Sequence, residues 1–120
     1  MYEELSQWLD RVLEGGLPEN AAAVNLNIYE EGDGGWSVQL IASDRYDGED
    51  DSWACFEVFT TGEDLYCWEK DYPWEEAEED LLEWAGRYLE EGQYADILKK
   101  LRAVGAGFVD GDLHILYEKE

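Results

Sequence analysis

The sequence predicts one α+β domain, a mainly antiparallel sheet of about six strands with helices packed mostly on one face. Three observations predict this class. Helical and strand periodicities follow one another in the order α-ββ-ββ-αα-ββ, the pairs of strands are separated by turn residues, and every connection is short. Because 120 residues suffice for one core and no repeat or linker is visible, we expect a single domain over residues 1–120.

The first helix is expected over Tyr2–Glu14, and Gly15 with Gly16 ends it. A first hairpin is expected next, from Ala22 to Glu31 and from Trp36 to Ser43. In it apolar side chains alternate with polar ones, which is typical of a sheet covered on one side. The alternating apolar set of its first strand is Val24, Leu26 and Ile28.

A second hairpin is predicted from Ser52–Phe59 and Asp64–Glu69, with Gly62 in the left-handed position of its turn. This register would place Cys55 opposite Cys67. Both faces of this hairpin are apolar, so either both are covered or one is an interface, and the chain is expected to be a monomer or a homodimer. Two cysteines and one histidine make an incomplete tetrahedral set, so we expect reduced thiols and neither a metal nor a cofactor.

The longest helix is predicted from Pro73 to Gly92, with Pro73 in its first turn and Gly92 closing it in a left-handed conformation. Acidic side chains near its start favour the positive end of the helix dipole. Its other face is expected to be a core stripe at steps of three and four residues. That stripe consists of Trp74, Ala77, Leu81, Trp84, Ala85 and Tyr88.

The C-terminal part is expected to contain a short helix, Gln93–Arg102, followed by a third hairpin. Its strands are predicted over Val104–Val109 and Leu113–Glu118, on either side of Asp110-Gly111, a strong hairpin signal.

The composition is strongly acidic, with 31 acidic and 8 basic residues and a net charge of −23. Direct binding to nucleic acid or to an anionic membrane is disfavoured, because such partners need a basic surface. A basic protein partner is favoured instead. The N-terminus lacks the features of a signal peptide and no run is long enough to span a membrane, so a cytoplasmic location is expected.

No catalytic motif is present, so the chain is not expected to be an enzyme. His114 is the only histidine and is expected to be an ordinary strand residue. The acidic loop from Asp44 to Asp51 lacks the spacing of an EF-hand, which leaves a solvated loop or part of a contact surface.

The candidate partner-binding residues are therefore the carboxylates of the long helix and those of the acidic loop, with a nearby aromatic side chain as anchor. The alternative for the helix is a solvated face that keeps the protein soluble. The candidates are Glu75, Glu76, Glu79, Asp80 and Glu83 on the helix, and Asp44, Tyr46, Asp47, Glu49, Asp50, Asp51 and Trp53 in and beside the loop.

The stretch from Tyr88 to Lys119 resembles the C-terminal part of small bacterial immunity proteins of polymorphic or contact-dependent toxin systems. The features behind the resemblance are Tyr88-Leu89, Gly92, Tyr94, Leu98 and the run from Gly107 to Leu113. The resemblance implies a small, acidic, cytoplasmic, non-enzymatic protein that binds one cognate toxin. It supplies no functional residue.

Three functions stay open at this point. The first is an immunity-type inhibitor of a basic toxin, with a nuclease favoured. The second is an inhibitor encoded by a mobile element that mimics nucleic acid and blocks a DNA-binding host enzyme. The third is a small enzyme or ligand-binding domain with an acidic cleft.

Overall fold

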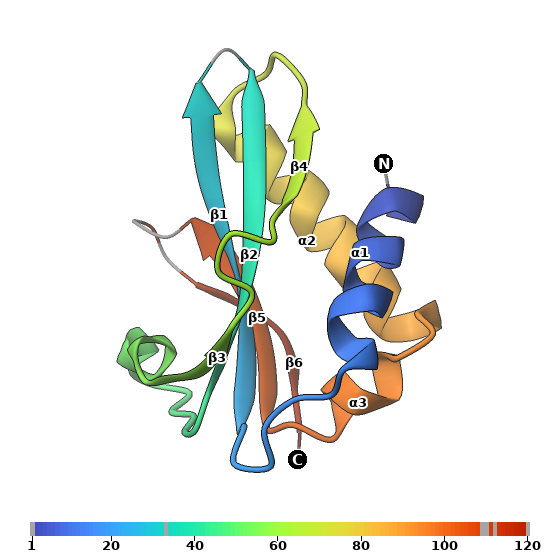
Figure 1. The fold of residues 1–120 in the computed structure, drawn as a ribbon. Coiled ribbons are helices and arrows are strands. Elements are labelled where there is room, and N and C mark those ends of the chain that lie inside the picture. Colours follow the sequence, from blue (N-terminus) through green and yellow to red (C-terminus); the bar gives the residue numbers. More distant parts are fainter. Residues whose placement is uncertain (1, 33, 109–110, 112, 120) are drawn as a thin grey trace.

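The computed structural model describes residues 2–32, 34–108, 111 and 113–119. These residues form three α-helices, a 3₁₀-helix and a six-stranded sheet, which confirms the predicted α+β class and the order of its elements (Figure 1). The elements are α1 (Tyr2–Glu14), β1 (Ala23–Gly32), β2 (Gly35–Ser43), the 3₁₀-helix η1 (Asp51–Cys55), β3 (Glu57–Thr60), β4 (Tyr66–Glu69), α2 (Trp74–Glu91), α3 (Ala95–Lys99), β5 (Ala103–Phe108) and β6 (His114–Glu118).

The sheet has the order β3-β2-β1-β5-β6, and β4 also pairs with β2. All described pairings are antiparallel except that of β1 with β5, which is parallel. The parallel pair forms because α2 and α3 carry the chain across one face of the sheet before β5 begins. The first and third predicted hairpins are therefore present as β1–β2 and β5–β6. Val109, the predicted last residue of a strand of the latter, and Asp110, in its predicted turn, lie outside the described residues.

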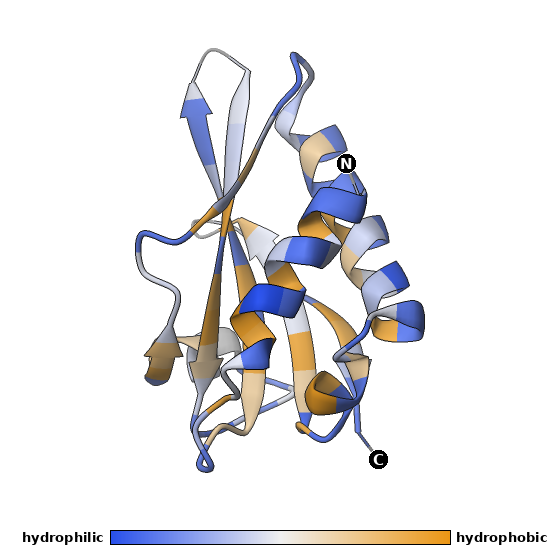
Figure 2. Ribbon diagram, turned by 45° about the vertical axis from the view of Figure 1, so that its right-hand side comes forward, coloured by the Kyte–Doolittle hydropathy of each residue, from blue (hydrophilic) through white to orange (hydrophobic). Residues whose placement is uncertain are grey.

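The main core lies between the sheet and the helices. Alternate residues of the central strands point to the helices, so that Leu26 is paired with Leu40 and Ile28 with Val38 on one face. Figure 2 shows hydrophobic residues along these strands and on the sides of the helices that face them. The helices contribute fully buried side chains to this layer, among them Leu5, Leu13, Leu81 and Tyr88.

The predicted second hairpin is wrong. β3 and β4 do not pair with each other; both pair with β2, through Ile41 with Thr60 and Val38 with Tyr66. They form one edge strand interrupted by residues 61–65. Cys55 therefore does not face Cys67, because it lies on η1, and both thiols are exposed.

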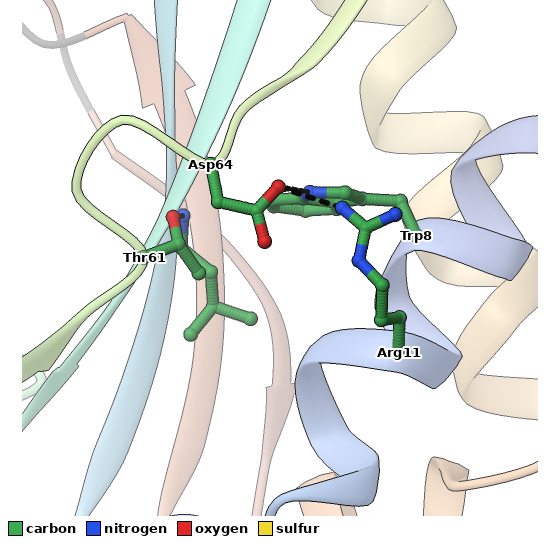
Figure 3. Close-up of polar contacts among 5 residues, drawn as sticks. Trp8, Arg11, Thr61 and Asp64 are labelled. Atoms are coloured by element: carbon green, nitrogen blue, oxygen red, sulfur yellow. Dashed lines mark hydrogen bonds and ion pairs between the residues drawn. The ribbon is translucent and has the colours of Figure 1, made fainter.

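Residues 61–65, which interrupt the edge strand, are held in place by contacts with β2 and with α1 (Figure 3). Thr61 exchanges two hydrogen bonds with Leu40 of β2, at 3.0 and 3.2 Å. Asp64 accepts from the indole of Trp8 at 3.4 Å and from the guanidinium of Arg11 at 2.6 Å, both on α1. The inserted residues thus tie the edge of the sheet to α1, which local sequence patterns do not reveal.

The two ends of the predicted long helix differ from expectation. Gly92 follows α2 with φ −68° and ψ 151°, an extended conformation, so the left-handed closure is wrong. Trp74 is 52% exposed and is not a core residue, because it stands on the first turn of α2. The next helix is also shorter than predicted: α3 spans Ala95–Lys99.

Candidate partner-binding surfaces

Four of the predicted helix carboxylates are exposed on α2: Glu75, Glu76, Glu79 and Glu83. The buried positions of this helix, such as Ala77, Leu81 and Ala85, recur at steps of four and face the sheet. The four carboxylates point away from that side, because the helix turns by about 100° per residue. They form one surface, which we call the α2 acidic stripe.

Two further acids of α2 are engaged inside the molecule. Asp80, predicted to bind a partner, accepts a hydrogen bond from the hydroxyl of Tyr72 at 2.9 Å, and that hydroxyl accepts one from the indole of Trp68 at 2.9 Å. Burial, together with the hydrogen bond to Asp80, raises the pKa of Tyr72 to about 12. Glu78 lies 3.0 Å from the imidazole of His114 on β6. Asp80 and Glu78 therefore link α2 to other elements and do not belong to the stripe.

The stripe has no internal counter-charge among the residues that the structure describes. The recorded ion pairs of the arginines are Arg11 with Asp64, Arg45 with Asp44 and Arg87 with Glu91. None of them reaches the α2 acidic stripe. Its charge faces solvent or another molecule.

The acids of the loop mostly stabilise the loop itself. Asp47 accepts from the backbone N–H of Glu49 at 2.9 Å, and Asp50 accepts from that of Ser52 at 3.0 Å, which caps η1. Hydrogen bonding lowers the pKa of Asp50. The side chain of Asp51 lies outside the described part of the chain.

Asp44 and Tyr46 are also engaged within the protein. Arg45 forms a 2.9 Å ion pair with Asp44 and lowers the pKa of that carboxyl. The hydroxyl of Tyr46 donates to Glu118 on the last strand, and this bond, with burial, raises the pKa of Tyr46 to about 12. Glu49 is exposed. Acidic side chains of the loop thus stabilise its turns through hydrogen bonds to the backbone.

Trp53 does not lie on the surface. Its side chain is 1% exposed and packs with Ala23 and Ala103 on the face of the sheet opposite the helices. The ring of Tyr46 meets it edge-on at 5.5 Å, and Ser43 Oγ donates to its backbone carbonyl at 2.6 Å. The expectation that Trp53 anchors a partner is therefore wrong: its apolar character serves a small second core within the chain.

The α2 acidic stripe and the acidic loop lie on opposite sides of the sheet. Figure 1 shows η1 on one side and the helices on the other. The alternation of side-chain directions along β1 leads to the same conclusion. Ala23 packs against Trp53 and the next residue, Val24, lies in the main core, so the two cores are on opposite faces of the sheet. A partner that docks flat on one of these surfaces does not reach the other.

One exposed aromatic side chain suits the role expected of Trp53. Trp74 directly precedes Glu75 and meets the ring of Phe108 edge-on, with centroids 5.6 Å apart and planes at 90°. Its helical spacing placed it in the core stripe. Its position immediately after Pro73 is the signal that it stands at the tip of the helix, where the sheet no longer covers it.

Within the described residues, no group of three or more His, Cys, Asp or Glu side chains could hold a metal ion. No helix of the described chain is both long and apolar enough to cross a membrane. Comparison of the chain with protein-family models, with curated protein sequences and with solved structures gives no match.

Proposed function

We propose that this protein is a bacterial, non-enzymatic inhibitor of the immunity type, which acts in the cytoplasm and neutralises a basic toxin by binding it. A nuclease is the toxin class that the charge favours. The supporting observation is the α2 acidic stripe, which is exposed and has no counter-charge among the residues that the structure describes, in a chain of net charge −23.

The stripe has the chemistry needed to occupy a cationic cleft. From Glu75 to Glu83 its carboxylates extend over about 12 Å of helix at 1.5 Å per residue. Lysine and arginine side chains that normally contact successive phosphates can contact carboxylates arranged in this way. Trp74 is exposed on the first turn of the same helix, on the side that meets Phe108 of β5, so a partner that covers the start of α2 as well as the stripe gains an aromatic contact of the kind that supplies most binding free energy. The charges raise the association rate.

The stripe lowers the stability of the isolated protein. Glu75 and Glu79, and likewise Glu79 and Glu83, are like charges at i,i+4 positions, each pair destabilising a helix by about 0.2–0.5 kcal/mol. A surface selected only for stability would interleave lysine or arginine at such positions. Uninterrupted carboxylates are what recognition of a basic partner requires.

The proposal predicts that a basic toxin is encoded beside this protein's gene, and the purified product of that neighbouring gene is assayed as a nuclease. Nuclease activity is measured as the protein is added, and a stoichiometric loss of activity is expected. The association rate is expected to fall steeply between low and high salt, because exposed charges are screened within about 10 Å at 0.1 M salt.

Two variants of equal net charge separate the stripe from the overall charge. One replaces Glu75, Glu76, Glu79 and Glu83 with glutamine, and inhibition is expected to weaken at least tenfold. The other makes the same replacements at exposed acids outside α2, where little change is expected. The second set is Glu14, Glu19, Glu57 and Glu63.

Equal inhibition by both quadruple variants would remove the stripe from the interface. If the nuclease stays active at every ratio while a DNA-binding host enzyme is inhibited instead, the mobile-element inhibitor replaces the immunity protein as the function.

A further inference from the structure

The edge of the sheet at β4 is open. β4 pairs with β2 on one side, and no other described strand pairs with it. The opposite edge of the sheet is less suited to pairing, because a bulge interrupts β5–β6 between Val104 and Gly105. Bulges are a common way in which proteins protect an edge strand.

The hydrogen-bond pattern shows which backbone groups of β4 face outward. Lys70 N donates to Gly34 O at 2.8 Å, so residues 34 and 70 form a hydrogen-bonded pair. In an antiparallel ladder such pairs alternate, so Trp68 and Tyr66 also direct their backbone groups to β2. Cys67 and Glu69 therefore direct their N–H and C=O groups to the open edge.

A hollow lies along this edge. Its volume is about 360 Å³, and it is lined by all four residues of β4 and by Glu4 of α1. Tyr66 and Trp68 are buried and their side chains belong to the main core, whereas Cys67 and Glu69 are exposed. There is thus space next to the outward backbone groups, with an aromatic core layer behind it.

The charge around the hollow indicates what occupies it. Glu4 and Glu69 supply carboxylates to its wall. Burial raises the pKa of the Cys67 thiol, and the negative charge of Glu31 adds to this rise. The nearest cation in sequence is Lys70, whose ammonium lies 4.9 Å from the centre of the Tyr72 ring. A second copy of the chain is a poor occupant, since it would bring the same acids, and another net charge of −23, to the interface.

We propose that β4 binds an extended, lysine- or arginine-containing segment of a partner protein, which adds to the sheet as a further strand beside Cys67 and Glu69. Main-chain hydrogen bonds provide the affinity, and the carboxylates select basic side chains. The proposal depends on the function proposed above only for the identity of that partner, because the open edge and the hollow are independent of α2.

The test uses a blocked peptide of alternating lysine and valine and nuclear magnetic resonance of the whole protein. The peptide is expected to slow hydrogen exchange at the amides of Cys67 and Glu69 about tenfold or more, and to leave those of Tyr66 and Trp68 unchanged. A control peptide of the same sequence, methylated on every backbone nitrogen, keeps the charge but cannot donate hydrogen bonds. Its binding is expected to be at least about tenfold weaker.

Two variants at one position isolate the backbone contact. Cys67→Ser keeps the outward N–H and is expected to bind the peptide as the wild type does. Cys67→Pro removes that N–H without removing a bond to β2, a placement tolerated at sheet edges, and is expected to lose binding about tenfold. Glu69→Gln is expected to weaken binding by about twofold to fivefold, the effect of losing one partly exposed ion pair.

The proposal is overturned if the control peptide binds as tightly as the first peptide, or if the peptide perturbs only the amides of the α2 acidic stripe. Self-association of the free protein that Cys67→Pro abolishes would assign the edge to a second copy instead. The peptide assay needs no toxin. Slowed hydrogen exchange at the amides of Cys67 and Glu69 would therefore support peptide binding at β4 even if the nuclease were not inhibited. Conversely, inhibition without protection would leave the proposed function intact.

Discussion

The ring of Tyr88 occupies the space next to Gly92 where any other residue would place its Cβ. A Cβ built on Gly92 would lie 2.5 Å from two ring carbons of Tyr88. The ring is fully buried, and its hydroxyl donates to Asp10 on α1 at 2.7 Å and accepts from the N–H of Tyr94 at 3.2 Å. The end of α2, the start of the next turn and α1 thus meet at one side chain.

Replacement of Gly92 by alanine is expected to destabilise the protein by about 1–3 kcal/mol, because the buried ring cannot move aside. Gly86 offers a matched control on the same helix, since a Cβ there would meet nothing within 4 Å. Gly86→Ala is expected to stabilise the protein by about 0.5–1 kcal/mol through helix propensity. Urea unfolding of the two variants checks both signs; equal effects would show that backbone freedom and not the ring determines the cost.

We expect that position 105 must be glycine, because the buried side-chain amide of Asn25 leaves no room for a Cβ there. A Cβ on Gly105 would lie 2.9 Å from Oδ1 of Asn25, which is fully buried and has no hydrogen-bond partner at that atom among the described residues. Gly105→Ala should therefore destabilise the protein, and Asn25→Ala in the same chain should relieve part of the loss. A double-mutant cycle is expected to give a coupling of about 0.5–3 kcal/mol. Strict additivity of the two changes would contradict the contact.

Stability is expected to fall between pH 10 and pH 12. The pKa values of Tyr46, Tyr66 and Tyr72 are raised from 10.0 to about 12, by burial in Tyr66 and Tyr72 and mainly by the bond to Glu118 in Tyr46. Tyrosine is neutral when protonated, so in this window the unfolded chain releases protons that the folded protein retains. The stabilisation is complete below pH 10 and is lost as the pH rises to about 12.

Thermal unfolding as a function of pH, with tyrosinate absorbance recorded in parallel, measures this loss. Burial also raises the pKa values of Tyr88 and Tyr2, so Tyr72→Phe removes one of several groups and should make the alkaline decrease shallower. If its slope equals that of the wild type, Tyr72 is not one of the groups responsible.

Asp64 is expected to contribute through its acceptor oxygen more than through its charge. Asp64→Ala removes the bonds from Trp8 and Arg11 and should cost about 0.5–1.5 kcal/mol. Asp64→Asn keeps an acceptor for the indole and should cost less. Arg11→Ala should cost about 0.2–1 kcal/mol and lose its effect in high salt, because the pair is exposed. A larger cost for Asp64→Asn than for Asp64→Ala would contradict this order.

The sequence predicted the elements whose signals are local. The alternation of Val24, Leu26 and Ile28 with polar residues predicted a strand with one core face, and the spacing of Ala77, Leu81 and Ala85 predicted the buried side of α2. Both predictions are confirmed, because side-chain direction follows directly from the strand and helix periods. Exposed carboxylates opposite a buried helix face could be predicted for the same reason.

What only the tertiary structure decided is which segment lies beside which. Residues 57–69 have the pattern of a hairpin, yet they run as one interrupted strand along β2, because the open edge of β2 provides backbone partners that no local pattern records. The burial of Trp53, the hydrogen bond of Asp80 to Tyr72 and the exposure of Trp74 likewise depend on distant neighbours. The sequence by itself determined the periodic elements and the sign of the charge, since these depend on neighbouring residues alone. The folded chain decided which acids, which aromatic side chain and which sheet edge remain available to a partner, because availability depends on contacts between segments far apart in the sequence.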